Sequence, residues 1–255
     1  MDASATRTHA LVVGGATGLG RTVVKTLARE GHDVSVIDRL PPGEAAPVPA
    51  VVHHQADLLD PARVEQVLAE AAARRGPVRC AVFCQRFRGD AGAWEGEIET
   101  TLGATRRIVE LLAERFPPGG EASIVMVGSV ADRFVAAEQP AGYHAAKAGL
   151  AQLARYFAVA LGPRGVRCNC VSPAIFVKEG AARGPAAGPA LERVIPLRRI
   201  PTAEEIARVI LFLCGPGAAC VTGQEIVVDG GLSLLAQATL VRQLTETPAR
   251  AGEAP

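Results

Sequence analysis

The 255-residue chain lacks a strong net charge and a long apolar run. Its 27 basic and 26 acidic side chains give a formal net charge of +1, so no long-range field points to nucleic acid or to an anionic membrane. No apolar run reaches the roughly 18 residues that a membrane-spanning helix needs. The first ten residues, MDASATRTHA, lack the apolar core of a secretory signal. We therefore expect a cytoplasmic protein that binds neither nucleic acid nor membrane.

The chain also lacks the Cys-x-x-Cys spacing. Its six cysteines stand at positions 80, 84, 168, 170, 214 and 220, and none forms the Cys-x-x-Cys pair of a zinc knuckle. Most of them lie inside apolar runs such as CAVFC and CNCVS. We expect small buried side chains in a reducing compartment, and no bound metal.

Apolar runs and helical patterns alternate along the rest of the chain. The apolar runs predict seven strands, over 9–15, 33–38, 49–57, 79–84, 122–129, 165–172 and 224–231. The patterns between them predict helices over 20–31, 60–76, 94–116, 141–162 and 202–215. Because most strands are apolar throughout, we expect a parallel sheet with helices on both faces. The predicted fold class is α/β, a single doubly wound domain of the Rossmann type.

Two segments depart from this alternation. Residues 178–195 are rich in Gly, Pro and Ala, which predicts a mobile loop at the ligand end of the sheet. Residues 233–244 predict a short extra helix with one apolar stripe. The stripe consists of Leu234, Leu235, Ala238, Val241 and Leu244. We therefore divide the chain into a large domain, 1–232, and a C-terminal extension, 233–255, that ends in a disordered tail.

A glycine-rich turn joins the first strand to the first helix. The sequence VGGATGLG places Gly14, Gly18 and Gly20 immediately before the helix, with Thr17 and Leu19 between them. Glycine allows the positive φ of a tight turn, and its missing side chain lets a pyrophosphate approach the main chain. The positive end of the helix dipole would then face the phosphates. A dinucleotide site is the prediction, and a purely structural turn is the alternative.

Asp38 ends the second strand, about 20 residues beyond the turn, where a ribose-binding acid is expected. Its carboxylate can accept hydrogen bonds from both ribose hydroxyls and would repel a 2′-phosphate. Arg39 follows it and could instead pair with that phosphate. We expect NAD as the cofactor, with NADP as the alternative. In the plainest interpretation Asp38 is only a solvated turn residue.

Tyr143 and Lys147 stand four residues apart in GYHAAKAG, which places both side chains on one face of a helix. An ammonium beside a phenol favours the ionised phenol, which could then both give and take a proton. The alternative is an amphipathic helix whose Tyr and Lys only pack against neighbouring side chains and contact solvent.

Together these motifs resemble the short-chain dehydrogenase/reductase family over residues 9–232. The likeness rests on GxxxGxG at 14–20, on the YxxxK helix, and on the segment 195–231, which ends in QEIVVDGG. The resemblance implies the Rossmann-type fold, NAD(P) as cofactor, oxidoreduction and a homotetramer. In that assembly the long helices at 94–116 and 141–162 would pack across one interface.

The resemblance also implies roles for single residues. Ser129 and Tyr143 would hold the substrate oxygen, and Lys147 would also bind the nicotinamide ribose. Thr100 falls on the family's active-site Asn when the count runs back from Gly103. The further cofactor-binding residues that the resemblance implies are Asp57, Leu58, Cys84, Pro173 and Phe176.

The family pattern is broken on the nicotinamide and substrate side. Val13 replaces a Thr, Phe83-Cys84-Gln85-Arg86 replaces NNAG, and Pro173-Ala174 replaces Pro-Gly. The Thr that touches the nicotinamide amide becomes Lys178 or a neighbour. Gln85, Arg86 and Arg88 would lie where the pocket opens. An arginine there could pair with a substrate carboxylate or phenolate, or it could be solvated.

Three functions fit these observations. The first is an NAD(P)-dependent oxidoreductase that interconverts a secondary alcohol and a ketone on a small organic substrate, as in specialised biosynthesis. The second is a non-redox dehydratase, isomerase or cyclase on the same fold. The third is a catalytically weak nucleotide sensor or scaffold, which the departures at 83–86 and Thr100 favour. Intact Ser129, Tyr143 and Lys147 favour an enzyme. We expect a homo-oligomer, tetramer or dimer, with the extra helix at or near a subunit contact.

Overall fold

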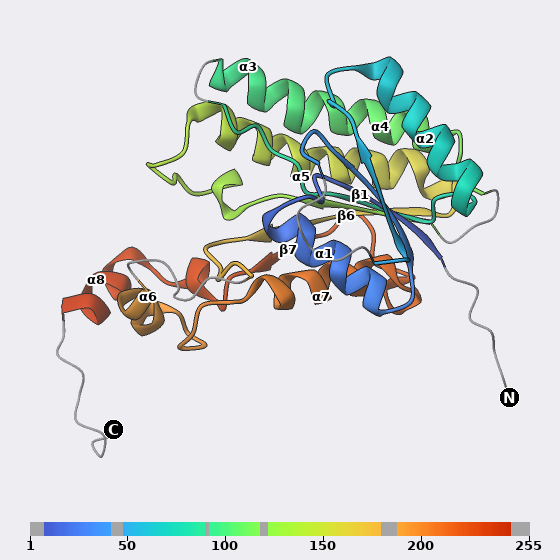
Figure 1. Ribbon diagram of the computed structural model, residues 1–255. Coiled ribbons are helices and arrows are strands. Elements are labelled where there is room, and N and C mark those ends of the chain that lie inside the picture. The colour runs from blue at the N-terminus through green and yellow to red at the C-terminus, as the bar shows by residue number, and fades with distance from the viewer. Residues whose placement is uncertain (1–7, 42–47, 90–91, 118–121, 180–187, 246–255) are drawn as a thin grey trace, which may run out of the picture.

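The computed structural model describes residues 8–41, 48–89, 92–117, 122–179 and 188–245. Within these ranges, parallel strands form one sheet in the order β3-β2-β1-β4-β5-β6-β7 (Figure 1). The strands are β1 His9–Val13, β2 Asp33–Asp38, β3 Val51–Gln55, β4 Cys80–Phe83, β5 Ala122–Val127, β6 Val166–Pro173 and β7 Glu225–Val228. The predicted doubly wound sheet of seven parallel strands is therefore confirmed.

Helices cover both faces of this sheet (Figure 1). One face carries α1 Gly18–Arg29 and α7 Ala203–Cys214. The other carries α2 Pro61–Arg75, α4 Ala104–Ala113 and α5 Ala141–Leu161. Along β1, Leu11 and Val13 enter the core under α2, α4 and α5, whereas Ala10 and Val12 enter the core under α1 and α7. Because both faces are buried, the strand is apolar at every position rather than at alternate ones.

The predicted helix starts at residues 60 and 202 are confirmed. The Asp60 Oδ1 atom accepts a hydrogen bond from the Arg63 N–H at 3.0 Å, with Pro61 at the first helical position of α2. Thr202 and Glu205 form a reciprocal capping box at the start of α7. Each cap satisfies N–H groups that the first helical turn leaves unpaired.

The single helix expected over 94–116 is wrong in its details. It consists of α3 Ala93–Glu97, a π-helical turn over Ile98–Gly103, and α4. Within the π-helical turn, Thr101 is fully buried, and its Oγ1 donates to Glu97 Oε2 at 3.0 Å. Such turns are rare and frequently occur at functional sites.

The loop expected over 178–195 is corrected in part. Residues 180–187 lie outside the described residues, but Gly188–Val194 form a helix, α6. Val194 and Ile195 are buried at its end, so packing outweighs the poor helix propensity of Gly and Pro. The extra helix, α8, spans Gln237–Thr245 instead of 233–244. It packs beside α6 (Figure 1), where Arg193 donates to the Gln243 carbonyl at 2.7 Å.

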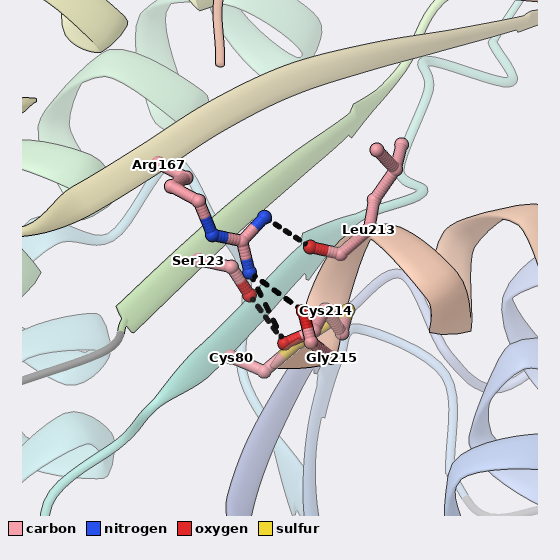
Figure 2. The surroundings of a disulfide bond; sticks show 6 residues. All are labelled: Cys80, Ser123, Arg167, Leu213, Cys214 and Gly215. Atoms are coloured by element: carbon pink, nitrogen blue, oxygen red, sulfur yellow. Dashed lines mark hydrogen bonds between the residues drawn. A yellow bond between two sulfur atoms is a disulfide. The ribbon is translucent and has the colours of Figure 1, made fainter. Parts of the chain in front are cut away.

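Two cysteines form a disulfide, whereas the sequence predicted small buried side chains in a reducing compartment. Cys80, on β4, is joined to Cys214, at the end of α7, with their Cα atoms 5.7 Å apart (Figure 2). Beside it, Arg167 donates to the carbonyls of Leu213 at 2.7 Å and Gly215 at 3.1 Å. These bonds satisfy carbonyls that the last turn of α7 leaves unpaired. Apolar sequence context predicted the burial of Cys80 but could not show what lies across the fold.

Cys168 and Cys170 are buried as expected, whereas Cys220 is exposed. Across the described ranges, no helix is long and apolar enough to cross a membrane. Among the same residues, no group of three or more His, Cys, Asp or Glu side chains is placed to hold a metal ion. The predicted tail, 246–255, lies outside the described ranges.

Candidate active site

The carboxyl ends of the strands border one cavity of about 510 Å³. It lies above β1 and β4, where the strand order reverses and where doubly wound folds bind their ligands. Every sequence-predicted site residue lines this cavity. They are Gly14, Thr17, Gly18, Leu19, Gly20, Asp38, Arg39, Asp57, Leu58, Cys84, Thr100, Ser129, Tyr143, Lys147, Pro173 and Phe176.

The glycine turn is shaped by close main-chain contacts. Gly14 and Gly18 have φ angles of 79° and 57°. A residue with a side chain would be strained at these angles. A Cβ at Gly14 would lie 2.6 Å from the Gln85 nitrogen, whereas at Gly18 the nearest atom is Arg88 Nη2, at 3.9 Å. Thr17, the N-cap of α1, makes no side-chain capping bond to the described residues. The turn is therefore tight inside, open above Gly18, and ready to donate N–H groups to an anion.

Asp38 holds this turn and also faces the cavity. Its Oδ2 accepts from the Ala16 N–H at 2.9 Å, and its Oδ1 accepts from the Leu40 N–H at 3.0 Å. Each carboxylate oxygen keeps a second lone pair that can accept from a ribose hydroxyl. Asp57 borders the same cavity and accepts from the Leu59 N–H at 2.9 Å. An open glycine turn followed by an acid fits the pyrophosphate and ribose of a dinucleotide.

Ser129, Tyr143 and Lys147 all line this cavity as well. Ser129 follows β5, and its Oγ accepts from the Ala131 N–H at 3.2 Å, so its O–H can donate to a ligand. Lys147 Nζ lies 5.7 Å from the centroid of the Tyr143 ring and donates to the Val127 carbonyl at 2.7 Å. The side chains on α5 are therefore held on one face, as the four-residue spacing predicted.

Lys147 is 4 % exposed, and its burial lowers the pKa of its ammonium from 10.5 to about 8. A fully desolvated cation costs free energy unless charges or dipoles compensate. The Val127 carbonyl supplies one such dipole. The half-buried Cys84 thiol, whose pKa is raised to about 12 by desolvation, stays protonated beside it.

The sequence pattern missed part of the cavity wall. Ile37, Leu40, Leu59, Phe87, Val127 and Gly128 also line it. Each stands at or just beyond the carboxyl end of a predicted strand, or beside a predicted site residue. That position in the sequence could have identified them as cavity residues. Gln85, Arg86, Arg88, Ala174 and Lys178, noted only as departures or pocket neighbours, line it too.

Arg86 is the clearest of these cases. Its guanidinium carbon lies 4.7 Å from the centroid of the Tyr143 ring, a cation–π arrangement. The phenol face therefore covers one side of Arg86, while its side chain remains 33% exposed to solvent.

The sheet and its cavity define an α/β protein of the dinucleotide-binding class. A family model described as enoyl-(acyl carrier protein) reductase matches residues 14–233. D-threitol dehydrogenase of Mycolicibacterium smegmatis is 29% identical over 242 residues, which cover 88% of this chain and 92% of that protein. The 3-oxoacyl-[acyl-carrier-protein] reductase MabA of Mycobacterium avium is 30% identical over 233 residues, which cover 88% and 89%.

The fold has close structural neighbours. A short-chain dehydrogenase from Leptospira borgpetersenii, solved with bound NAD+, superposes with a TM-score of 0.78 at 20% identity. The match covers 89% of this chain and 93% of that one. The chain belongs to the short-chain dehydrogenase/reductase family, whose members are NAD(P)-dependent oxidoreductases.

Proposed function

We propose that the protein interconverts a secondary alcohol and a ketone on a small organic substrate. The observation that carries this proposal is the presence of Ser129, Tyr143 and Lys147 in the same cavity as a turn that fits a dinucleotide. A bound nicotinamide cofactor would supply or remove the hydride. The chain itself must then bind the substrate oxygen and move one proton.

Three side chains divide this work. In the reducing direction, the Tyr143 O–H donates its proton to the carbonyl oxygen, and the Ser129 O–H donates a hydrogen bond to the same atom. Lys147 stabilises the phenolate that remains, because it is a buried cation next to the ring. In the oxidising direction the phenolate accepts the proton of the alcohol. Thr100, which lines the cavity from the π-helical turn, would hold a water near this group.

We propose NAD as the preferred cofactor. The Asp38 carboxylate lies at the cavity edge and would repel a 2′-phosphate, while its free lone pairs suit ribose hydroxyls. The bound NAD+ of the Leptospira protein is consistent with this preference. Arg39 lines the same edge and is the feature that favours NADP.

An assay of purified protein against a panel of ketones and secondary alcohols tests the activity. The panel is run with NADH, NADPH and their oxidised forms, and the absorbance of the reduced nicotinamide is followed. We expect turnover of at least one pair, faster with NAD(H). Substrate conversion without a change in cofactor absorbance would indicate the dehydratase, isomerase or cyclase instead. Tight NADH binding without any conversion would indicate a sensor or scaffold.

We propose a homo-oligomer, a tetramer or a dimer. On α5, Tyr156 and Val159 are 63% and 81% exposed, and on α8, Val241 and Leu244 are 59% and 45% exposed. Such apolar side chains are typical of surfaces that another subunit covers. Light scattering on the full-length protein and on a version cut after Leu232 tests this. A monomer refutes the assembly, and an unchanged oligomer of equal thermal stability after truncation refutes the role of α8.

We propose that the protein works in the cytoplasm, and the Cys80–Cys214 pair makes this testable. Disulfides are rare in that compartment. Alkylation of thiols in intact cells, followed by mass spectrometry, should therefore find this pair reduced at least in part. A fully oxidised pair in freshly trapped cells contradicts the proposed location.

A further inference from the structure

Two arginines on the segment that follows β4 approach different features of the cavity. The Arg86 guanidinium stacks on the Tyr143 ring. The Nη2 atom of Arg88 is instead the atom nearest to the open side of Gly18. Phe87, between them, packs so closely that a Cβ at Gly96 would lie 2.5 Å from its ring. Arg86 therefore lies beside the Tyr143 ring, and Arg88 lies beside the glycine turn.

Several contacts orient Arg86. Its Nε donates to the Phe87 carbonyl at 3.2 Å, and its Nη2 donates to Gln139 Oε1 at 3.2 Å. The carboxylate of buried Glu97 lies 3.8 Å from Nη2, and this carboxylate also accepts from Thr101. Held in this way, the guanidinium loses little conformational freedom when a ligand binds, which favours affinity.

One side of the guanidinium remains available. Nη1 has no hydrogen-bond partner among the residues that the structure describes, and the Arg86 side chain is 33% exposed. The acidic residues that line the cavity are Asp38 and Asp57, which sit beside the turn and the adenosine position. Around Tyr143 the lining charges are the cations Arg86 and Lys147, with Glu97 behind them. The local field therefore favours a small anion.

We propose that Arg86 binds a carboxylate of the substrate, so that the enzyme acts on oxo acids and hydroxy acids. This inference rests on the proposed function, because it assumes that the reacting oxygen binds Tyr143. A guanidinium stacked on the phenol ring places its free N–H groups within a short chain length of that oxygen. Guanidinium and carboxylate are matched in shape and charge, and their hydrogen bonds are strong. The carboxylate therefore lies close in the chain to the reacting carbon, as in α-oxo and β-oxo acids.

A bracing role for Arg86 makes a different prediction. If Arg86 only neutralises Glu97 and supports Gln139, its loss should slow all substrates by the same factor. If it binds a substrate carboxylate, its loss should slow only substrates that carry one. The comparison of charged and neutral versions of one compound separates these roles without knowledge of the natural substrate.

The experiment uses α-oxo and β-oxo compounds, each as free acid, methyl ester and primary amide. We measure kcat/KM for the full-length wild type, Arg86→Gln, Arg86→Lys and Arg164→Gln. Arg164 is the matched control, because it is exposed on the turn that precedes β6, at the opposite end of the strands. In the wild type the acid should exceed its ester by about 10- to 100-fold. Arg86→Gln should abolish this preference by slowing the acid at least about tenfold more than the ester, Arg86→Lys should retain part of it, and the control should match wild type.

A second readout needs no turnover. Calorimetry with the protein, NADH and an unreactive carboxylic acid should show binding to wild type and to the control, and weaker binding to Arg86→Gln. Thermal melts show whether that variant is folded. Equal kcat/KM for acid and ester in wild type, or equal losses for both in Arg86→Gln, would overturn the inference while the proposed function stands. If no carbonyl compound reacts, the proposed function fails, and equal calorimetric affinities of wild type and Arg86→Gln overturn the inference as well.

Discussion

The glycine turn at residues 14–20 and the group formed by Ser129, Tyr143 and Lys147 border the same cavity but are built from different parts of the chain. The turn depends on main-chain N–H groups and on glycines that no side chain can replace, as the 2.6 Å contact at Gly14 shows. The second group depends on side chains from α5 and from the turn that follows β5. The comparison teaches that main-chain geometry fixes the glycine turn, whereas side-chain contacts position the residues that we propose to act on the substrate.

The largest effect should come from Tyr143→Phe, which removes only the phenolic O–H. We expect kcat to fall by at least about 100-fold, because the proton donor is lost, while NADH affinity changes little. Steady-state kinetics and calorimetry measure the two quantities. Tyr156→Phe is the control, since Tyr156 is 63% exposed on α5. Activity above a tenth of wild type in the Tyr143 variant would contradict the assigned role.

Gly14→Ala tests the other region, where main-chain geometry dominates. The added methyl meets the Gln85 main chain at 2.6 Å, so we expect a loss of about 2–4 kcal/mol in the free energy of unfolding. Gly31→Ala is the matched control, since Gly31 also has a positive φ but a Cβ there has no neighbour within 4 Å. Urea denaturation compares the two. Equal losses would mean that backbone strain, and not the close contact, constrains Gly14.

Asp38→Asn should alter cofactor choice with less damage to the turn. The amide oxygen can still accept from the Ala16 N–H, but the charge that repels a 2′-phosphate is gone. We expect the ratio of kcat/KM for NADH to that for NADPH to fall by about tenfold. In Asp38→Asn/Arg39→Gln the gain with NADPH should be smaller. An unchanged ratio, or a wild type that already prefers NADPH, refutes the role of Asp38.

The last prediction concerns the buried cation. The folded pKa of Lys147 is about 8 and its ordinary value is 10.5, so between these pH values the unfolded chain binds more protons. The free energy of unfolding should therefore rise with pH across this window and be flat below about pH 8. Lys147→Met removes the group, so the difference between wild type and variant isolates it. Denaturation at several pH values should show that the free energy of unfolding of the wild type rises relative to that of the variant as the pH increases. A difference that does not change with pH contradicts the assignment.

The sequence predicted most of the fold because its signals are local. Apolar runs mark buried parallel strands, and Asp60 and Thr202 mark helix starts by bonds to residues three positions on. Gly14, Gly18 and Asp38 were predictable for the same reason, since the turn and the acid lie within one strand–helix–strand unit.

The errors arose where distant residues decide. The helix α6 forms in a segment rich in Gly and Pro because its end is buried. Cys80 and Cys214 are far apart in the sequence, and only the fold brings them together. The position of Arg86 over Tyr143 depends on contacts with Gln139 and Glu97. No pattern along the chain reports such contacts.

The most direct test of the account is hydride transfer itself. NADH that carries deuterium at its transferable position is incubated with the protein and a carbonyl substrate, and the product is analysed by mass spectrometry. The account predicts that the wild type forms a product with deuterium on its carbinol carbon. Tyr143→Phe should not accumulate this deuterated product, although both proteins bind NADH. Two results would contradict the assignment of this protein as an oxidoreductase. One is a product that forms without deuterium, and the other is no product with any carbonyl compound although NADH is bound.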